Sequence, residues 1–73
     1  MAITNIHDAE KEFYFFQIGT SGSFHTLLFK TIFAADYKNR ASLALGFPYE
    51  VEVVRKYEEV PGYWEQIQNF GGR

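Results

Sequence analysis

The chain contains no cysteine, and only one methionine and two prolines, among its 73 residues. The missing cysteine excludes disulfide frameworks, thiolate zinc sites and cysteine nucleophiles. It also excludes a small secreted scaffold held together by disulfides, which favours a cytoplasmic location. No segment is low in complexity and 47% of the residues are apolar, so we expect a folded chain rather than a disordered one.

Long hydrophobic runs are also missing. The longest wholly apolar runs, such as residues 13–16, are four residues long, whereas a helix that crosses a bilayer needs roughly 20. The first seven residues lack the basic and apolar regions of a signal peptide, which favours a mature cytosolic start. We therefore expect no membrane partner.

Basic residues are not in excess, because the formal net charge is −2. Residues 1–46 hold four acidic and four basic residues, while residues 47–73 hold five acidic and three basic ones. Binding to the phosphate backbone of nucleic acid requires a basic surface, so this balance disfavours nucleic acid as the partner. The acidic excess lies entirely in the last third of the chain.

Aromatic side chains, by contrast, are abundant, with eight Phe, five Tyr and one Trp. A domain of this size buries only about 60% of the surface that its unfolded chain exposes. Each aromatic ring brings roughly 150–250 Å² to be buried, so a core this small has difficulty enclosing all of them. Either aromatic rings simply fill the volume of a small core, or some rings stay outside and mark an interface.

Glycine, proline and polar turn residues divide the chain into five short segments. Apolar residues recur in them at helical spacing, which predicts helices over residues 5–18, 24–35, 37–45, 49–59 and 62–70. Because the connections are short, the sequence predicts an all-α fold, a single-domain bundle of four to five short helices over residues 1–73. An α+β alternative stays open, in which residues 12–18 and 49–54 pair as a hairpin of strands.

Residue types at the segment boundaries support this division. Three boundaries carry residues that cap helix N-termini, namely Thr4 or Asn5, Ser21 or Ser23, and Asp36. Gly46 fits the left-handed position that ends a helix. Pro48 suits the first turn of the next helix, where its missing N–H is not needed.

The second segment, residues 24–35, is apolar around most of its circumference. On a helix, one of its faces carries Phe24, Leu27, Leu28, Ile32 and Ala35, with Phe29 and Phe33 on an adjacent flank. We therefore expect this helix to be the central one, with Phe24, Phe29 and Phe33 in the core.

Two motifs stand out in the second half of the chain. The first runs through Asp36, Asn39, Arg40, Leu43, Gly46, Phe47 and Pro48. The second is Gly62, Tyr63, Trp64 and Glu65, and it follows a charged segment that ends in Tyr57. Over residues 34–65 the order of these residues resembles that in a group of short proteins from bacteriophages and other mobile elements. Tyr49 departs from the group's pattern, where an acidic or polar residue is expected. The resemblance implies a helical protein of the bacterial host cytoplasm that inhibits a host defence or nucleic-acid enzyme, in the manner of an anti-CRISPR protein.

Candidate catalytic groups are few and poorly spaced. His7 and His25 are 18 residues apart and form no metal-binding pattern. The glycine- and serine-containing run at 19–23 lacks the Lys-Ser/Thr ending of a phosphate-binding loop, and a turn is the ordinary role of such residues. A serine nucleophile with His25 as its base has no nearby acid to orient it. We expect no enzyme activity, no metal site and no cofactor.

The sequence thus favours a non-enzymatic protein-interaction module whose partner is another protein or a second copy of the chain. Its candidate contact residues combine polar-tipped rings with the acidic excess. They are Tyr37, Tyr49, Tyr57, Glu58, Glu59, Tyr63 and Trp64. The alternative is a small nucleic-acid-binding accessory protein. It would use the basic residues and neighbouring rings Phe29, Lys30, Phe33, Tyr37, Lys38 and Arg40.

Overall fold

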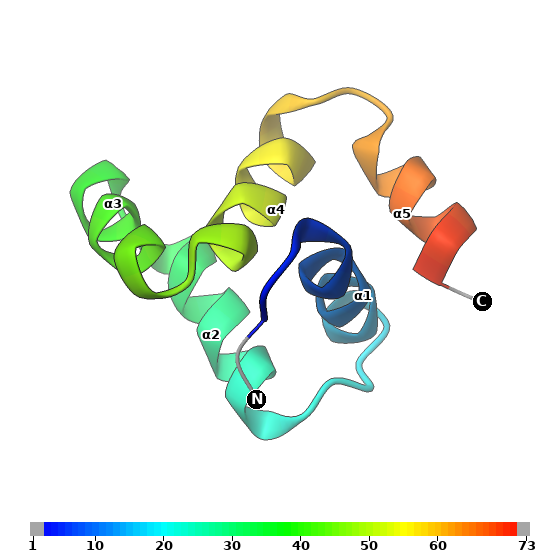
Figure 1. The fold of residues 1–73 in the computed structure, drawn as a ribbon, viewed down its shortest axis with the longest axis horizontal. Coiled ribbons are helices and arrows are strands. Elements are labelled where there is room, and N and C mark those ends of the chain that lie inside the picture. Colours follow the sequence, from blue (N-terminus) through cyan, green and yellow to red (C-terminus); the bar gives the residue numbers. More distant parts are fainter. Residues whose placement is uncertain (1–2, 72–73) are drawn as a thin grey trace.

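The computed structural model describes residues 3–71, and Figure 1 shows them as short helices that cross one another. The helices are α1 (Ile6–Gln17), α2 (Ser23–Ala34), α3 (Tyr37–Gly46), α4 (Pro48–Glu59) and α5 (Tyr63–Gly71). No strand occurs within residues 3–71, so the all-α prediction is confirmed. The α+β alternative is not supported, because residues 12–17 are helical in α1 and residues 49–54 are helical in α4. None of the described helices has the length and apolar character that crossing a bilayer requires.

Two predicted caps hold the starts of α1 and α3. Asn5 Oδ1 accepts a 2.9 Å hydrogen bond from the backbone N–H of Asp8, and Asp36 Oδ1 accepts one of 2.8 Å from that of Asn39. Such a bond satisfies one of the N–H groups that a helix start leaves unpaired. Pro48 is the first residue of α4, as predicted from its missing N–H.

The start of α2 differs from the prediction. Gly22 occupies the cap position without a side-chain hydrogen bond, and Ser23 is already helical. The hydroxyl of Ser21 lies 2.6 Å from Oγ1 of Thr26, one turn into the helix. The predicted serine cap is therefore wrong, because the Ser21 hydroxyl is engaged with another side chain.

Glycine ends one helix through a left-handed backbone but does not end another. Gly19 has a φ of 81°, and the N–H groups of Gly19 and Thr20 donate to carbonyl oxygens in the last turn of α1. This is the Schellman arrangement of a helix C-terminus. The left-handed conformation predicted for Gly46 is wrong, since Gly46 is the last helical residue of α3 and its φ is not positive. Phe47 ends α3 instead, because the proline that follows disfavours a helical backbone there.

The core lies where α1, α2, α4 and α5 meet (Figure 1). Phe13 of α1 is fully buried, and the centroids of five other rings lie 5.1–6.1 Å from its own. These rings belong to Phe16, Phe29, Phe33, Tyr57 and Trp64. The aliphatic side chains that are fully buried in this core are Ala9, Ile32, Val53, Val54 and Ile67. Aromatic pairs at these distances add about 0.5–1.5 kcal/mol each beyond the effect of burial.

The helices at the centre are α1 and α4, and not α2 as predicted. α1 packs on α2, α4 and α5, and α4 packs on all four other helices. α2 buries only the side formed by Leu28, Phe29 and Ile32. Phe29 is fully buried as predicted, and Phe33 packs against the core. A helix that is apolar on nearly all sides does not indicate which side is buried, so periodicity did not exclude Phe24 from the core.

Candidate interaction surface

Three of the predicted contact rings lie against the core. Tyr57 and Trp64 are 5.1 and 6.1 Å from the ring of Phe13 and 6.0 Å from each other. Tyr63 is only 3% exposed. Tyr57 and Trp64 keep part of their surface in contact with solvent, but the ring of Tyr63 is closed off from any partner in this conformation.

The hydroxyl of Tyr63 ties α5 to α1. It donates a 2.5 Å hydrogen bond to Oε2 of Glu10, whose Oε1 lies 3.3 Å from Nδ1 of His7. Burial raises the pKa of the Tyr63 hydroxyl well above its ordinary value of 10.0, and the bond to the Glu10 carboxylate raises it further. The polar tip of Tyr63 therefore has a structural role within the bundle.

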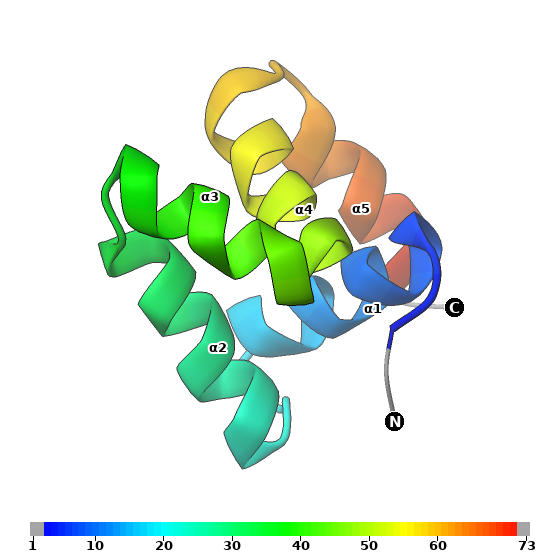
Figure 2. The same cartoon turned by 60° about the vertical axis from the view of Figure 1, so that its left-hand side comes forward.

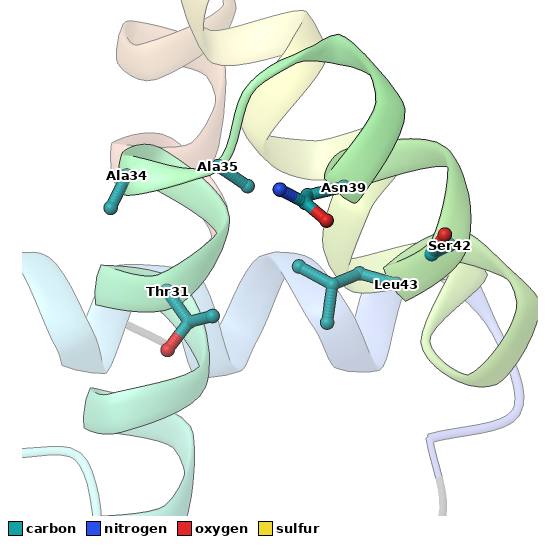
Figure 3. A pocket seen from close by; sticks show the side chains of 6 residues that line it. All are labelled: Thr31, Ala34, Ala35, Asn39, Ser42 and Leu43. Atoms are coloured by element: carbon teal, nitrogen blue, oxygen red, sulfur yellow. The ribbon is translucent and has the colours of Figure 1, made fainter.

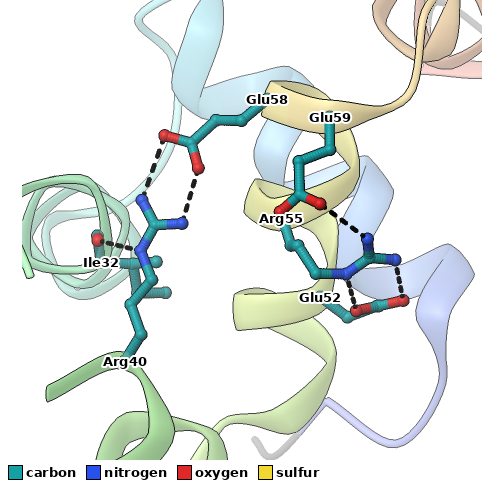
Figure 4. A network of polar contacts seen from close by, with 6 residues as sticks. All are labelled: Ile32, Arg40, Glu52, Arg55, Glu58 and Glu59. Carbon is teal, nitrogen blue, oxygen red and sulfur yellow. Dashed lines mark hydrogen bonds and ion pairs between the residues drawn. The ribbon is translucent and has the colours of Figure 1, made fainter. Parts of the chain in front are cut away.

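Glu58, another predicted contact residue, is held by an ion pair between α3 and α4 (Figure 4). Arg40 donates from Nη1 and Nη2 to its two carboxylate oxygens at 2.6 and 3.1 Å. Nε of Arg40 also donates to the carbonyl oxygen of Ile32 at 3.0 Å. Bidentate pairing of this kind is strong among ionic hydrogen bonds, and it lowers the pKa of Glu58. This Arg40–Glu58 clamp joins α2, α3 and α4.

A second network on α4 holds Glu59, also a predicted contact residue (Figure 4). Arg55 donates two hydrogen bonds of 2.8 Å to Glu52, and its Nη1 lies 3.5 Å from Oε1 of Glu59. The bonds from Arg55 lower the pKa of Glu52. The protein's own arginines therefore compensate the acidic charge of Glu58 and Glu59.

The outer face of α2 is apolar and open to solvent. Phe24 and Leu27 are 58% and 65% exposed, so the predicted place of Phe24 in the core is wrong. Leu28 and Phe29 lie further around the helix by about 100° per residue and fill the core instead. The surplus of apolar residues on α2 was the sign in the sequence that part of this helix stays exposed. A single helix cannot bury all of its sides in so small a protein.

A groove lies between α2 and α3, and we call it the α2–α3 groove (Figure 3). Leu27 precedes its lining residue Thr31 by four positions and therefore shares that side of α2. It has a volume of about 450 Å³ and is lined by Thr31, Ala34, Ala35, Asn39, Ser42 and Leu43. Asn39 and Leu43 point from α3 toward α2. The hydroxyl of Thr31 donates to the carbonyl oxygen of Leu27 at 2.8 Å and is thus satisfied within its own helix. The groove is therefore mainly apolar, with the Asn39 amide and the Ser42 hydroxyl as its polar groups.

One lysine accompanies each wall of the α2–α3 groove. Lys30 precedes Ala34 by four residues on α2, and Lys38 precedes Ser42 by four on α3, so each shares a helix face with a lining residue. Both lysines are exposed, and no carboxylate of the described chain pairs with either. Residues 23–46 hold three basic residues and one acidic one, so this end is positive within a chain of net charge −2.

α3 is the helix that leaves most of itself outside, and Figure 2 shows it on the exterior of the molecule. It alone among the five described helices contributes no buried side chain. Tyr37, a predicted contact residue, is 89% exposed at its start, and Leu45 is equally exposed near its end. Tyr49, predicted as well, is exposed in the first turn of α4. Of the predicted rings, Tyr37 is the one that the structure presents most openly.

Each of the two histidines lies close to a glutamate, and the two contacts are separate. Nδ1 of His7 lies 3.3 Å from Glu10, and Nδ1 of His25 lies 3.5 Å from Glu12. Glu12 is an acid near His25 that sequence spacing did not reveal. No group of three side chains suited to hold a metal ion occurs in the part of the chain that the structure describes.

Comparison of the chain with protein-family models, with curated proteins and with solved structures found no match in any of the three. The resemblance to phage and mobile-element proteins therefore rests on the sequence motifs alone.

Proposed function

We propose that the chain is a non-enzymatic protein-interaction module that binds another protein through the α2–α3 groove and the outer face of α2. The observation that carries this proposal is that Leu27 and Phe24 are both more than half accessible. They lie one and two helical turns before the groove-lining Thr31 on the same side of α2. Contiguous exposed apolar surface rimmed by polar residues is typical of protein-binding sites. A partner that covers this surface removes apolar area from water, and the hydrophobic free energy gained is about 25 cal/mol per Å² of that area.

The partner segment that fits this surface is an amphipathic helix with acidic residues. A groove between two helices accepts a third helix whose apolar residues recur every three or four positions. Lys30 and Lys38 stand beside the two walls, so carboxylates along the flanks of that helix would face unpaired ammonium groups. In keeping with the sequence resemblance, we propose that the helix belongs to a bacterial defence or nucleic-acid enzyme that the chain inhibits.

Nucleic acid fits the same surface less well. Of the residues considered for such contacts, Phe29 is buried and Arg40 is engaged in the Arg40–Glu58 clamp. Phe33 packs against the core. Lys30, Lys38 and the exposed ring of Tyr37 remain. Affinity for phosphates grows with the number of charges neutralised, so two lysines give little of it.

Capture with matched surface variants tests this proposal. Wild type, Leu27→Gln and Val60→Gln are immobilised and exposed to a bacterial lysate; Val60 is also an exposed apolar residue, but it lies just after α4. We expect a protein that wild type and Val60→Gln retain and that Leu27→Gln loses. Carbodiimide coupling of the complex should link Lys30 or Lys38 to an aspartate or glutamate of that protein. The proposal is overturned by identical retention on all three columns, or by Leu27-dependent retention of nucleic acid alone.

A further inference from the structure

A second hollow lies at the connection between α4 and α5, and we call it the α4–α5 hollow. It has a volume of about 330 Å³ and shares no lining residue with the α2–α3 groove. Most of the contact residues expected from the sequence line it, and the proposed function uses none of these. They are Tyr57, Glu58, Glu59, Tyr63 and Trp64. A hollow of this size matches a small ligand or a single side chain.

Two aromatic rings form walls of the α4–α5 hollow. The rings of Tyr57 and Trp64 lie 6.0 Å apart with their planes at 87°, and both residues keep part of their surface in contact with solvent. Phe13, on which both rings pack, is fully buried. The core therefore lies on one side of the two rings and the hollow on the other. The face of an aromatic ring attracts a cation within about 6 Å of its centroid.

A ring beside these two already holds a cation of the chain itself. Nζ of Lys56 lies 5.3 Å from the centroid of the Tyr63 ring, which is a cation–π contact. Because Tyr63 is almost fully buried, its ring offers no surface to a ligand. Tyr57 and Trp64 are therefore the rings of this hollow that are left to receive a cation from outside.

The charges around the α4–α5 hollow also favour a cation. Glu58, Glu59 and Glu65 line it, and none of its described lining residues is basic. Arg40 and Arg55 offset the first two carboxylates, whereas Glu65 forms no ion pair in the described chain. The C-terminus of α4 and the N-terminus of α5 meet here, and their opposite dipole charges largely cancel. One uncompensated negative charge remains at the rim.

Hydrogen bonding decides which kind of cation fits. Both carboxylate oxygens of Glu58 are already engaged by Arg40. A lysine ammonium is strongly hydrated and needs acceptors to replace the water that it loses. A quaternary ammonium has no N–H group, and its methyl groups can pack on the rings and on Val60 and Pro61, which also line the hollow. Aromatic rings recognise such ligands through cation–π attraction.

We infer that the α4–α5 hollow binds a quaternary ammonium group between the rings of Tyr57 and Trp64, with Glu65 at its rim. The group belongs either to a small molecule such as choline or to a trimethylated lysine side chain of another protein. The site goes beyond the proposed function and does not depend on it, because none of its residues lines the α2–α3 groove.

Fluorescence titration tests the chemistry of the ligand. Trp64 is the single tryptophan of the chain, so its emission reports on this hollow. Wild type is titrated at constant ionic strength with choline, with N-acetyl-trimethyllysine amide and with N-acetyl-lysine amide. We expect both methylated probes to half-saturate at about 1–10 mM and the lysine amide to bind about fivefold more weakly.

The relative affinities of the probes identify the source of the group. Tighter binding of choline assigns the site to a small molecule, and tighter binding of the trimethyllysine amide assigns it to a protein side chain. Equal binding of the unmodified lysine amide overturns the inference. So does the absence of a response to both methylated probes up to about 100 mM, roughly ten times the weakest half-saturation expected.

Matched variants locate the binding. Glu65→Gln should weaken choline binding about threefold, whereas Glu12→Gln, a matched change on α1, should leave it unchanged. Tyr57→Leu should weaken it about fivefold; because Tyr57 also packs on Phe13, circular dichroism checks that this variant is folded. Wild-type affinity in Glu65→Gln, or in folded Tyr57→Leu, overturns the site.

Leu27→Gln separates this inference from the proposed function. Leu27 does not line the α4–α5 hollow, so the variant should bind choline as wild type does while it loses the captured protein. Capture that depends on Leu27 without any choline binding overturns the hollow alone. Choline binding that depends on Glu65, without such capture, supports the hollow and overturns the function of the groove.

Discussion

A phenylalanine is buried at one end of this protein and exposed at the other. Phe13 of α1 is fully buried among five other rings, whereas Phe24 of α2 leaves more than half of its surface in water. Both residues belong to apolar stretches of helices of twelve residues. They differ in their cover, because α2, α4 and α5 surround α1 while no described helix lies over the outer face of α2. Apolar composition alone therefore does not make a core; a second layer of helices must close over it.

Truncating a ring at each end gives the largest expected contrast. Phe13→Ala should destabilise the fold by about 3–5 kcal/mol, because it leaves a cavity in the aromatic core. That is a large part of the total stability expected for so small a domain. Phe24→Ala removes the same atoms from a solvated site and should change the free energy of unfolding by less than about 1 kcal/mol. Urea denaturation of both variants measures the difference, and similar losses would mean that α2 is covered.

Removing the Tyr63 hydroxyl comes next in size. Tyr63→Phe should cost about 2 kcal/mol at neutral pH, because the Glu10 carboxylate loses a buried donor. The pKa of this hydroxyl is raised in the fold, so its neutral form stabilises the protein fully below pH 10 and this contribution is lost as the pH rises above 10. The variant should therefore show a weaker loss of stability in alkali than wild type. Tyr49→Phe, at an exposed ring, is the matched control and should leave the alkaline profile unchanged.

The Arg40–Glu58 clamp should contribute a smaller amount. A double-mutant cycle with Arg40→Gln and Glu58→Gln should give a coupling energy of about 1 kcal/mol, because the pair is bidentate but partly exposed. Arg40 lowers the pKa of Glu58 below its ordinary 4.5, so the pair stabilises the fold above pH 4.5 and this contribution fades as the pH falls below that value. Glu58→Gln should flatten part of the acid limb of the stability profile. A coupling energy near zero would show that packing alone holds α3 on α4.

The smallest effects on stability are expected at the exposed leucines. Leu27→Gln and Leu45→Gln should each change the free energy of unfolding by less than about 0.5 kcal/mol, because both side chains are largely in water. Thermal unfolding followed by circular dichroism checks this. A loss above about 2 kcal/mol in either variant would place that leucine in a packed environment and remove the corresponding surface from the account.

The fold class and several helix boundaries could be predicted because they depend on local chemistry. Asn5 and Asp36 cap their helices through their own side chains, and Pro48 fixes the start of α4 by lacking an N–H. These signals need no knowledge of the rest of the chain. Gly46 was expected to end α3, but α3 continues through Gly46 and ends at Phe47, because Phe47 precedes a proline.

The candidate surface depends on tertiary packing, and the sequence indicated only part of it. Tyr37 was predicted as a contact residue because its apolar ring carries a polar hydroxyl, and the structure exposes it. Tyr63 is the same residue type, but its hydroxyl donates a hydrogen bond to Glu10 of α1 inside the bundle. Phe24 was assigned to the core because α2 is apolar nearly all round, and only the positions of α1 and α4 decide which side is buried.

In the single molecule, the α2–α3 end is open to solvent while the α1–α4–α5 end is closed. Hydroxyl-radical footprinting of the dilute protein, read residue by residue by mass spectrometry, tests it directly. We predict rapid oxidation of Tyr37, Leu27 and Phe24 and slow oxidation of Phe13 and Tyr63, after correction for the intrinsic reactivity of each residue type. Protection of Phe24 to the level of Phe13, or of Tyr37 to that of Tyr63, would contradict the claim.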